Sequence, residues 1–465
     1  MPSIHANTVK MSPKVLEDWN PEDDDWSENG GRRIARRNLL ISVFTLFLAF
    51  AVWTVWSLVV VYLPDAGFAY SDSQLFLLAA LPPLAGATGR VFYSFAVPIF
   101  GGRRFNAFAT ATLLIPALGL GVAVQNPETP FGLMALLAAS AGLGGANFSS
   151  SMDHIAYFFP QRKEGTALGL NAGVGNIGVS GAQFAVPLVI TVSVFGAFGG
   201  GGLGGNPGGN TMWLQNAGFI WIPFILVGTV ASYFGLNDIA NVNANFREQL
   251  TILKRKHNWI MCWLYVGTFG SFLGYATAFP LLTTLQFPAQ NVALFAFWGP
   301  LLGAIVRPPG GWLSDRFGGA RVTLWVFVTM AIGTGLVIYF MIEGVFWGFF
   351  AAFMLLFLAS GVGNGSTFKM IPVIFRKRYL EKLSDPSPKE RRQALKRAEL
   401  EAGSVLGFSG GIGAYGGFFI PQAFSLSVEI TEATVAAMTV FLLFYLTCIA
   451  TTWYYYYRDT AEAPC

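Results

Sequence analysis

The chain has 465 residues, of which 54% are hydrophobic, 15% aromatic and 12% charged, and its formal net charge is +4. This composition is typical of a protein that crosses a membrane several times, and it excludes an ordinary soluble domain. The positive charge does not indicate a nucleic-acid partner, because the basic residues are confined to particular segments. The sequence contains no metal-ligand cluster, phosphate-binding loop or catalytic triad, so we predict neither an enzyme nor a bound metal or cofactor.

Residues 1–37 precede the first apolar run. They hold an acidic cluster at Glu22–Asp25, followed by four arginines between Arg32 and Arg37. We expect a solvated tail with a basic flank on the cytoplasmic side of the first membrane span. A cleavable signal peptide is not expected, because the first apolar run begins near Asn38 and is too long.

Twelve apolar runs follow, and each can supply the ~20 residues that a membrane-spanning helix needs. The sequence therefore predicts an all-α membrane protein with twelve transmembrane helices. The runs lie near residues 38–63, 75–99, 105–125, 130–158, 165–195, 215–236, 257–280, 290–313, 320–342, 346–375, 402–424 and 432–457.

Lysine and arginine are distributed unequally among the segments between these runs. The loops after the first, third, fifth, seventh, ninth and eleventh runs contain none. The opposite set of loops is basic, and its longest member is a charged loop that includes residues 376–397. By the positive-inside rule, we expect both termini to lie in the cytoplasm. Only Arg90, Arg307 and Lys369 are basic residues well inside the runs.

Two sequence patterns occur once in each half of the chain. Residues 86–104 and 303–321 both read Gly-Ala-x-x-Arg, nine residues, then Phe-Gly-Gly-x-Arg. A glycine pattern in the fifth span recurs in the eleventh, and its matched positions are Gly169, Gly173, Gly175 and Gly178 with Gly407, Gly411, Gly413 and Gly416. Duplication of a six-helix unit predicts two bundles with a substrate site between them, near the midplane of the membrane.

The predicted organisation follows from this duplication. The six-helix bundles correspond to residues 38–236 and 257–457. A polar cytoplasmic linker, 237–256, joins them and contains a helical stretch near residues 245–250. Residues 458–465 form a short cytoplasmic tail.

Arg90 and Arg307 give the sharpest indication of function. Each lies ten residues from its polar loop, a distance of roughly 15 Å that reaches the middle of a hydrocarbon core about 30 Å thick. A charge at this depth costs at least about 3 kcal/mol, even on lenient insertion scales. Two buried salt bridges would explain the pair without a ligand, but no acidic residue lies at the same depth. We predict that both guanidinium groups bind a flat anion.

The glycine repeats and the polar residues near them have two interpretations. Glycines at this spacing most often allow close packing of helices, but they can also present backbone groups to a small ligand. Asn176 interrupts an apolar run and suits a polar contact with an oxyanion, as does Ser409 opposite Asn171.

Three titratable residues lie about 10 Å inside the cytoplasmic ends of the fourth and tenth spans. They are Asp153, His154 and Lys369. One hypothesis is that Asp153 and Lys369 pair across the bundle interface when the cytoplasmic side is closed. The alternative is that each reaches the membrane surface by itself. His154 is either a group that titrates near neutrality or a packed residue.

These residues together resemble the NarK-type nitrate/nitrite porters of the major facilitator superfamily. The resemblance extends over essentially the whole chain and includes residues 97–104, 144–148 and 268–272. The two glycine repeats are similar to the paired nitrate signatures of that family. The resemblance implies the major facilitator fold, alternating access, a functional monomer in the bacterial cytoplasmic membrane, and nitrate import that is often exchanged for nitrite.

The resemblance also implies a set of residues that bind the substrate. In such a family, Arg90 and Arg307 hold the anion, and the rings of Phe148 and Phe269 lie on either side of it. The side chains of Asn176 and Tyr265 form hydrogen bonds to the anion in such a family.

The chain departs from the family pattern at a few positions. Asp153, His154 and Lys369 stand where small or neutral residues are expected, and Tyr415 is bulkier than expected. Titratable groups leave nitrate/proton symport open as an alternative, and a carrier of another small organic or inorganic anion is a second alternative. We favour exchange, because two cations about 8 Å apart in an empty site repel each other by roughly 2 kcal/mol at an effective dielectric constant near 20.

Overall fold

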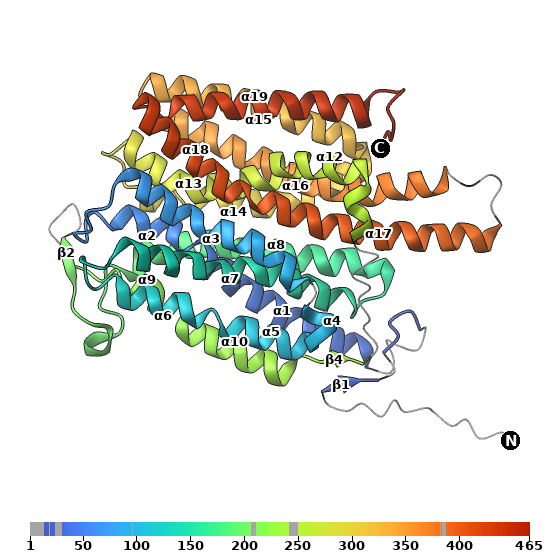
Figure 1. Cartoon of the computed structure of the whole chain (residues 1–465), viewed down its shortest axis with the longest axis horizontal. Coiled ribbons are helices and arrows are strands. Elements are labelled where there is room, and N and C mark those ends of the chain that lie inside the picture. The colour runs from blue at the N-terminus through green and yellow to red at the C-terminus, as the bar shows by residue number, and fades with distance from the viewer. Residues whose placement is uncertain are drawn as a thin grey trace.

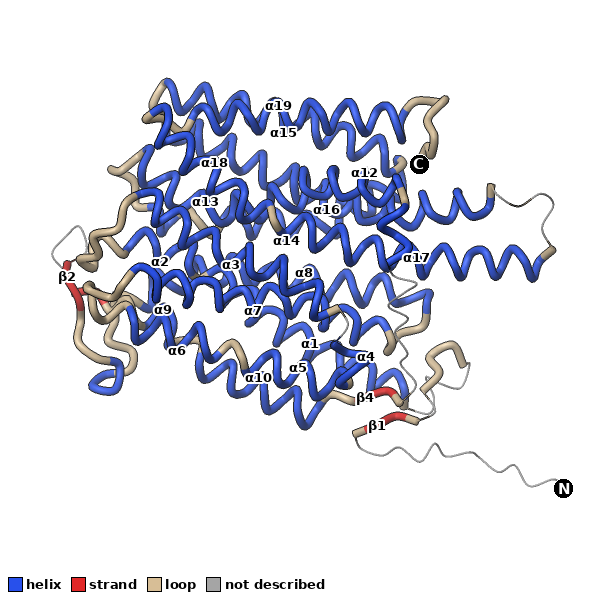
Figure 2. The backbone as a smooth tube through the Cα atoms, in the orientation of Figure 1, coloured by secondary structure: helices blue, strands red, loops and turns tan. Residues whose placement is uncertain are grey.

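The structure is a computed structural model that describes residues 14–17, 19–23, 30–94, 96–205, 211–240, 250–381, 383 and 387–465. Within these ranges the chain is mostly helical, and long helices run side by side along one axis (Figure 1). Figure 2 shows that the strands of the described ranges are short pieces near the two ends of this helical body. Nine helical segments of the described ranges are long and apolar enough to cross a membrane. The predicted all-α class is confirmed.

The first half of the chain forms six helical spans at the predicted places. The capping box of Ser71 and Gln74 starts the second span, since each satisfies a backbone N–H of the first turn. A hairpin of β2 (Leu203–Gly205) and β3 (Thr211–Met212) precedes the sixth. The spans are α1 (Gly31–Thr54) with α2 (Trp56–Tyr62), α3 (Asp72–Tyr93) with α4 (Ala96–Phe100), α5 (Gly102–Ala111) with α6 (Leu114–Ala123), α7 (Phe131–Ala156), α8 (Gln161–Val189), and α9 (Asn216–Phe219) with α10 (Ile222–Gly235).

The second half repeats this arrangement. Its first span is not a uniform helix, because a π-helical turn, η4 (Val266–Gly270), separates two α-helical pieces. The spans are α12 (Lys256–Tyr265) with α13 (Ser271–Gln286), α14 (Trp298–Phe317), α15 (Gly319–Ile342), α16 (Phe346–Leu380), α17 (Pro388–Ala414) with α18 (Gly416–Thr431), and α19 (Val435–Thr452) with the π-helical η6 (Trp453–Tyr457). Each of the twelve predicted spans therefore contains a helix, although α14 begins eight residues after the predicted start of its span near residue 290.

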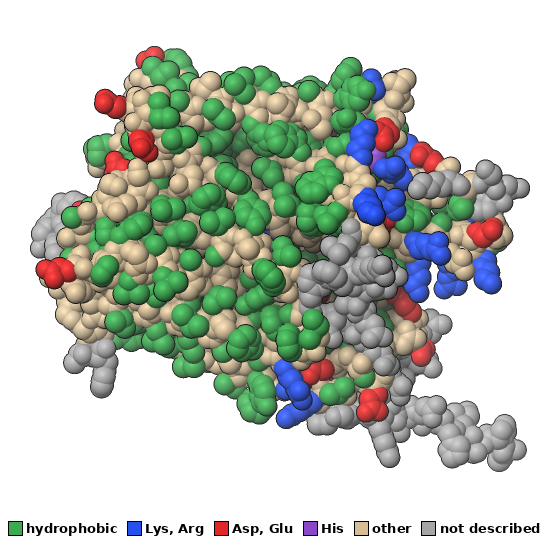
Figure 3. All heavy atoms as spheres, in the orientation of Figure 1, with side chains coloured by type: hydrophobic (Ala, Val, Ile, Leu, Met, Phe, Trp, Pro, Cys, Tyr) green, Lys and Arg blue, Asp and Glu red, His purple; other side chains and the backbone are tan. Residues whose placement is uncertain are grey.

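Charge distinguishes the two ends of the helical body. In the view of Figure 3, Lys and Arg side chains gather at the end from which α16 and α17 project, whereas the charged side chains at the opposite end are acidic. We call the first the basic end; it carries Arg104, Arg316, Lys377 and Arg392. The second is the acidic end, with Asp65, Glu128, Glu343 and Glu432. Strand β1 (Val15–Leu16) and the C-terminal residues both lie at the basic end (Figure 1).

The prediction of a solvated N-terminal tail is only partly correct for the described residues: Lys14, Glu17 and Glu22 are exposed, but strand β1 is paired and partly buried. Strand β1 pairs in parallel with β4 (Asp238–Ile239) at the start of the linker. The Leu16 side chain is 3% exposed and packs with Ile34, Ala35 and Phe158. An apolar side chain at this position gains by covering the end of the bundle. Helix α1 also begins at Gly31, before the predicted start of the first span. Asp24 and Asp25 lie outside the described residues.

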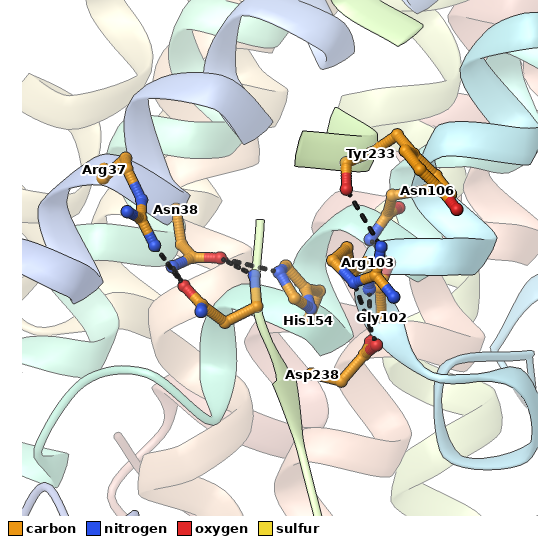
Figure 4. A network of polar contacts seen from close by, with 9 residues as sticks. Arg37, Asn38, Gly102, Arg103, Asn106, His154, Tyr233 and Asp238 are labelled. Atoms are coloured by element: carbon orange, nitrogen blue, oxygen red, sulfur yellow. Dashed lines mark hydrogen bonds and ion pairs between the residues drawn. The ribbon is translucent and has the colours of Figure 1, made fainter. Parts of the chain in front are cut away.

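The start of the linker is fastened to the first bundle by polar contacts (Figure 4). The Asp238 carboxylate accepts hydrogen bonds from the backbone N–H of Arg103 at 2.8 Å and from its Nε at 3.2 Å. Beside it, the amide oxygen of Asn38 accepts from the backbone N–H of Asn237 at 3.0 Å. The same oxygen lies 3.3 Å from Nε2 of His154, so this histidine is a packed, hydrogen-bonded residue here. Residues 241–249, which hold most of the predicted helical stretch of the linker, lie outside the described ranges.

The C-terminal tail is docked at the equivalent place in the second bundle. The backbone N–H of Ala320 donates to the backbone oxygen of Cys465 at 3.0 Å, at the position that Arg103 occupies in the first repeat. Glu462 accepts from Lys256 Nζ at 2.7 Å and contacts His257 at 3.2 Å. The hydrogen bond from Lys256 holds the pKa of the Glu462 carboxyl below its usual range. In both repeats, the segment after the sixth helix thus caps the loop between the second and third.

The sequence predicts a charged loop after the tenth span. In the structure most of this segment is helical instead. Helix α16 continues to Leu380, and α17 begins at Pro388, so two helical arms project beyond the bundle (Figure 1). Ser387 and Glu390 form a capping box, and Pro388 occupies the first turn. The Lys, Arg, Glu and Ala residues that follow are strong helix formers, so their charge predicts a solvated helix as well as a loop.

Candidate functional site

Arg90 lies at the junction of the two bundles, and its side chain is 2% exposed. Its Nε donates to the backbone oxygen of Gly145 in α7 at 3.0 Å. Its Nη1 donates to the backbone oxygen of Gly410 in α17, in the other bundle, at 2.8 Å. Its Nη2 is buried and has no hydrogen-bond partner among the described residues. Two hydrogen bonds that Arg90 donates thus hold its side chain in place, and its Nη2 is left free to donate to another group.

Aromatic rings surround this guanidinium. The ring centroids of Trp53, Phe148 and Phe269 lie 5.3, 4.6 and 5.4 Å from Arg90 Cζ. Ring faces attract a desolvated cation, so the three rings compensate part of the hydration that Arg90 loses. The structure therefore brings the two predicted phenylalanines together at Arg90; their position on either side of an anion stays a prediction.

Arg307 approaches from the second bundle and is 9% exposed. Its Nη2 lies 3.4 Å from the Tyr265 hydroxyl oxygen, which accepts. The Tyr265 and Phe269 rings are 5.7 Å apart. Since Phe269 also contacts Arg90, these two side chains on α12 and its π-helical turn bridge the two guanidinium groups. The predicted residues Arg90, Arg307, Phe148, Tyr265 and Phe269 form one cluster.

In the described ranges, neither arginine has an acidic partner. No carboxylate lies within 4.0 Å of Arg90 or Arg307 in the described part of the chain. Two acids that the sequence places nearest in depth are paired elsewhere: Asp315 with Lys369 at 2.9 Å, and Glu401 with Arg255. The interpretation of two buried salt bridges therefore has no support among the described residues, and the positive charge of the cluster is left for a ligand to balance.

Asn176, in α8, is 1% exposed, and neither its amide nitrogen nor its amide oxygen has a hydrogen-bond partner among the residues that the structure describes. Leaving a buried polar group unpaired costs about 1–3 kcal/mol, so such a group is uncommon unless a ligand or water completes it. This is the state expected of a side chain that bonds a substrate. Its contact with an anion held by the arginines stays a prediction.

The repeated glycines divide into two groups by position. A Cβ added at Gly175 or Gly178 would collide with α1, and one at Gly413 or Gly416 with Tyr265 or Gly270. The glycines nearer the basic end meet nothing within 4 Å, and these are Gly169, Gly173, Gly407 and Gly411. Close packing thus explains one half of each repeat, whereas the other half faces open space.

The hydrogen bonds and ring contacts that the structure describes between the bundles lie at the arginines or toward the acidic end. Three side-chain hydrogen bonds cross between the bundles in the described ranges: Arg90 to Gly410, Thr88 to Tyr415 at 3.0 Å, and Gln183 to Ala276 at 2.7 Å. The last two, and the stacked rings of Phe76 and Phe424, lie toward the acidic end of their helices. Together with the open glycines, this pattern describes a molecule closed at its acidic end and open toward its basic end.

The predicted pair of Asp153 and Lys369 is not formed in this conformation. Lys369 instead contacts Asp315 of its own bundle. Because the basic end is open here, a contact that closes it would be absent, so the hypothesis stays a prediction. Asp153→Asn and Lys369→Gln should each favour the open basic end. A cysteine at Ser404, half-exposed in α17, should then react faster with a thiol reagent supplied from that side.

Neutralising an exposed acid at the end of α16 supplies the matched control for this experiment. Glu381 lies 3.9 Å from Lys377 of its own helix, and Glu381→Gln should leave the labelling rate unchanged. Equal rates for the Asp153 and Lys369 variants and for this control would show that the pair does not close the basic end.

Several contacts of the cluster were not predicted from the sequence. These are the Trp53 ring, the Phe368 ring 5.8 Å from Arg307 Cζ, and the backbone oxygens of Gly145 and Gly410. The glycine run that includes Gly145 could have indicated that a long side chain approaches the backbone there, since a Cβ at Gly145 would collide with Trp53.

Two six-helix bundles that meet around a buried polar site define a carrier of the alternating-access type. Residues 9–183 match the Major Facilitator Superfamily. The nitrate/nitrite transporter NarU of Escherichia coli K12 is 49% identical over 459 residues, which are 97% of each chain. The probable nitrate/nitrite antiporter NarK2 of Thermus thermophilus is 41% identical over 468 residues, 97% of this chain and 98% of that one. The chain belongs to the NarK-type nitrate/nitrite porters of the major facilitator superfamily.

Solved structures agree on the fold. The inward-open xylose transporter XylE from E. coli superposes with a TM-score of 0.62 at 12% identity, over 89% of this chain and 95% of that one. A bacterial homologue of the human lysosomal transporter Spinster gives a TM-score of 0.61 at 13% identity, with the same coverage. The predicted major facilitator fold is confirmed.

Proposed function

We propose that this chain carries nitrate and nitrite across the bacterial cytoplasmic membrane, with its basic end and both termini in the cytoplasm. One observation carries the proposal: two buried guanidinium groups, one from each bundle, have no carboxylate within 4.0 Å among the described residues. The names of the relatives NarU and NarK2 support nitrate and nitrite as the anions. The opening at the basic end then corresponds to an inward-facing carrier.

The geometry suits a small, flat oxyanion. The free Nη2 of Arg90 and the guanidinium of Arg307 supply planar donors to its oxygens. The rings of Phe148 and Phe269 narrow the space beside Arg90 and exclude water, which strengthens each of these interactions. Asn176 adds an amide that can donate to an oxygen of the same anion.

Exchange follows from the charge of the empty site. The backbone oxygens of Gly145 and Gly410 and the Tyr265 hydroxyl offer Arg90 and Arg307 partial dipoles, but none supplies a full negative charge. Closing the basic end without an anion would dehydrate two like charges. Reorientation is therefore favoured when an anion is bound, which couples the entry of one anion to the exit of another.

Uptake of labelled nitrate into proteoliposomes tests this proposal. With equal pH on both sides, internal nitrite should accelerate uptake by roughly thirtyfold over internal chloride, the rate equivalent of about 2 kcal/mol of charge repulsion. Uptake that needs no internal nitrite or nitrate and follows an imposed proton gradient would instead establish symport. No uptake of either anion under any condition would leave another small anion as the substrate.

A further inference from the structure

Gln183 lies in α8, between the arginine cluster and the acidic end, and its side chain is fully buried. Its Nε2 has two acceptors. One is the Ser57 hydroxyl of the same bundle at 3.1 Å, and the other is the backbone oxygen of Ala276 in α13 of the second bundle at 2.7 Å. One amide nitrogen therefore joins the two bundles at a place that the substrate site does not include.

The backbone oxygen of Ala276 is free for this contact because of Pro280. In a regular helix it would accept from the N–H four residues later, but that residue is Pro280, which has no N–H. Ala276 is 1% exposed, and a buried carbonyl without a partner is costly. Gln183 supplies from the opposite bundle the donor that α13 itself lacks.

The surrounding hydrogen bonds fix the amide in this orientation. The Ser57 hydroxyl donates to the backbone oxygen of Thr54 at 2.7 Å, so it is left to accept from Gln183. The amide oxygen of Gln183 is buried and has no partner in the described ranges. When the acidic end closes, the hydrogen bond from Gln183 to Ala276 forms, but the Gln183 amide oxygen has no donor in the described ranges. When the bundles separate, water can reach this oxygen and donate to it.

We propose that the hydrogen bond between Gln183 and Ala276 is a positioning contact that holds the acidic end closed and sets the proportion of inward-open and outward-open molecules. The unpaired amide oxygen keeps this contact weak enough to break in each cycle. The hydrogen bonds between Thr88 and Tyr415 and from Arg90 to Gly410 join the bundles at another place, between α3 and the end of α17. The consequence for transport rests on the proposed function, whereas the conformational effect does not.

The experiment is a spin-label distance measurement between cysteines at Ser73 and Glu429, with the three native cysteines replaced. Both positions are exposed at the acidic ends of α3 and α18, which belong to different bundles. Gln183→Met should increase the long-distance, outward-open population by roughly fivefold, the equilibrium equivalent of one lost hydrogen bond. Gln183→Asn, whose amide is one methylene too short, should shift the distances in the same direction.

Pro280→Ala provides a second test of the mechanism, because it restores at position 280 the N–H donor that the backbone oxygen of Ala276 lacks within its own helix. In the Pro280→Ala background, Gln183→Met should cause little further change. Gln422→Met is the matched control, since the Gln422 Nε2 is buried and has no hydrogen-bond partner in the described part of the chain. Unchanged distances for Gln183→Met, or an equal shift with and without Pro280, would overturn the proposal. The distances are measured without substrate. A failed exchange assay would therefore contradict the proposed function but not the role of Gln183 in holding the acidic end closed.

Discussion

Arg90→Lys should reduce nitrate/nitrite exchange by on the order of a hundredfold, although it preserves the charge. Arg90 serves acceptors in three directions: the Gly145 oxygen, the Gly410 oxygen and the place left for the anion at Nη2. A planar guanidinium has donors for all of them, whereas an ammonium group is a compact charge on a flexible stem. Initial exchange rates in proteoliposomes, corrected for the amount of inserted protein, measure the loss.

Arg307→Lys should be impaired for the same reason, because Arg307 must reach both the Tyr265 hydroxyl and the anion. The matched control is Arg104→Lys, at an exposed position of the basic end, which should exchange at the rate of the unaltered protein. Near-normal kinetics for both buried variants would show that positive charge alone binds the anion, and that the fork of donors has no role.

The membrane-spanning architecture could be predicted because it depends on long runs of similar residues. Each span needs about 20 apolar residues, and a repeat such as 86–104 with 303–321 reports duplication directly. What was missed depends on contacts between distant, short segments. Strand β1 pairs two residues with two others more than 200 positions away, and no periodicity marks either partner. The charged arms of α16 and α17 were missed because charge indicates solvent and does not separate a helix from a loop.

The site could be predicted only in part, for a related reason. Arg90 and Arg307 are recognisable because a charge at mid-membrane depth is costly, and the absence of nearby acids can be read from the same stretch of sequence. The acceptors that orient Arg90 are backbone oxygens, which every residue carries, so Gly145 and Gly410 had no distinguishing signal as acceptors. The division of the glycine repeats into packed and open halves depends on the conformation, which the sequence does not specify.

Asn176→Leu should lower the apparent affinity for nitrate by roughly tenfold and, at the same time, raise the thermal stability of the empty carrier. The two effects have one cause. Both polar atoms of this buried amide are unpaired without substrate, so an apolar side chain of similar size removes an unsatisfied group. The hydrogen bond to the bound anion is lost in the same change. Thermal unfolding with and without nitrate measures both effects, because ligand that binds the folded state raises the melting temperature.

Asn38→Leu is the matched control for this prediction. The Asn38 amide is equally buried but fully engaged: it donates to the Ile34 backbone oxygen at 2.9 Å and to the Asn237 side chain at 3.0 Å, and it accepts from the Asn237 N–H. Its removal should therefore lower the melting temperature. If Asn176 binds the substrate, the melting temperature should rise in Asn176→Leu and fall in Asn38→Leu. If Asn176→Leu also lowers the melting temperature and nitrate still protects it fully, the Asn176 amide stabilises the helices and does not bind the anion.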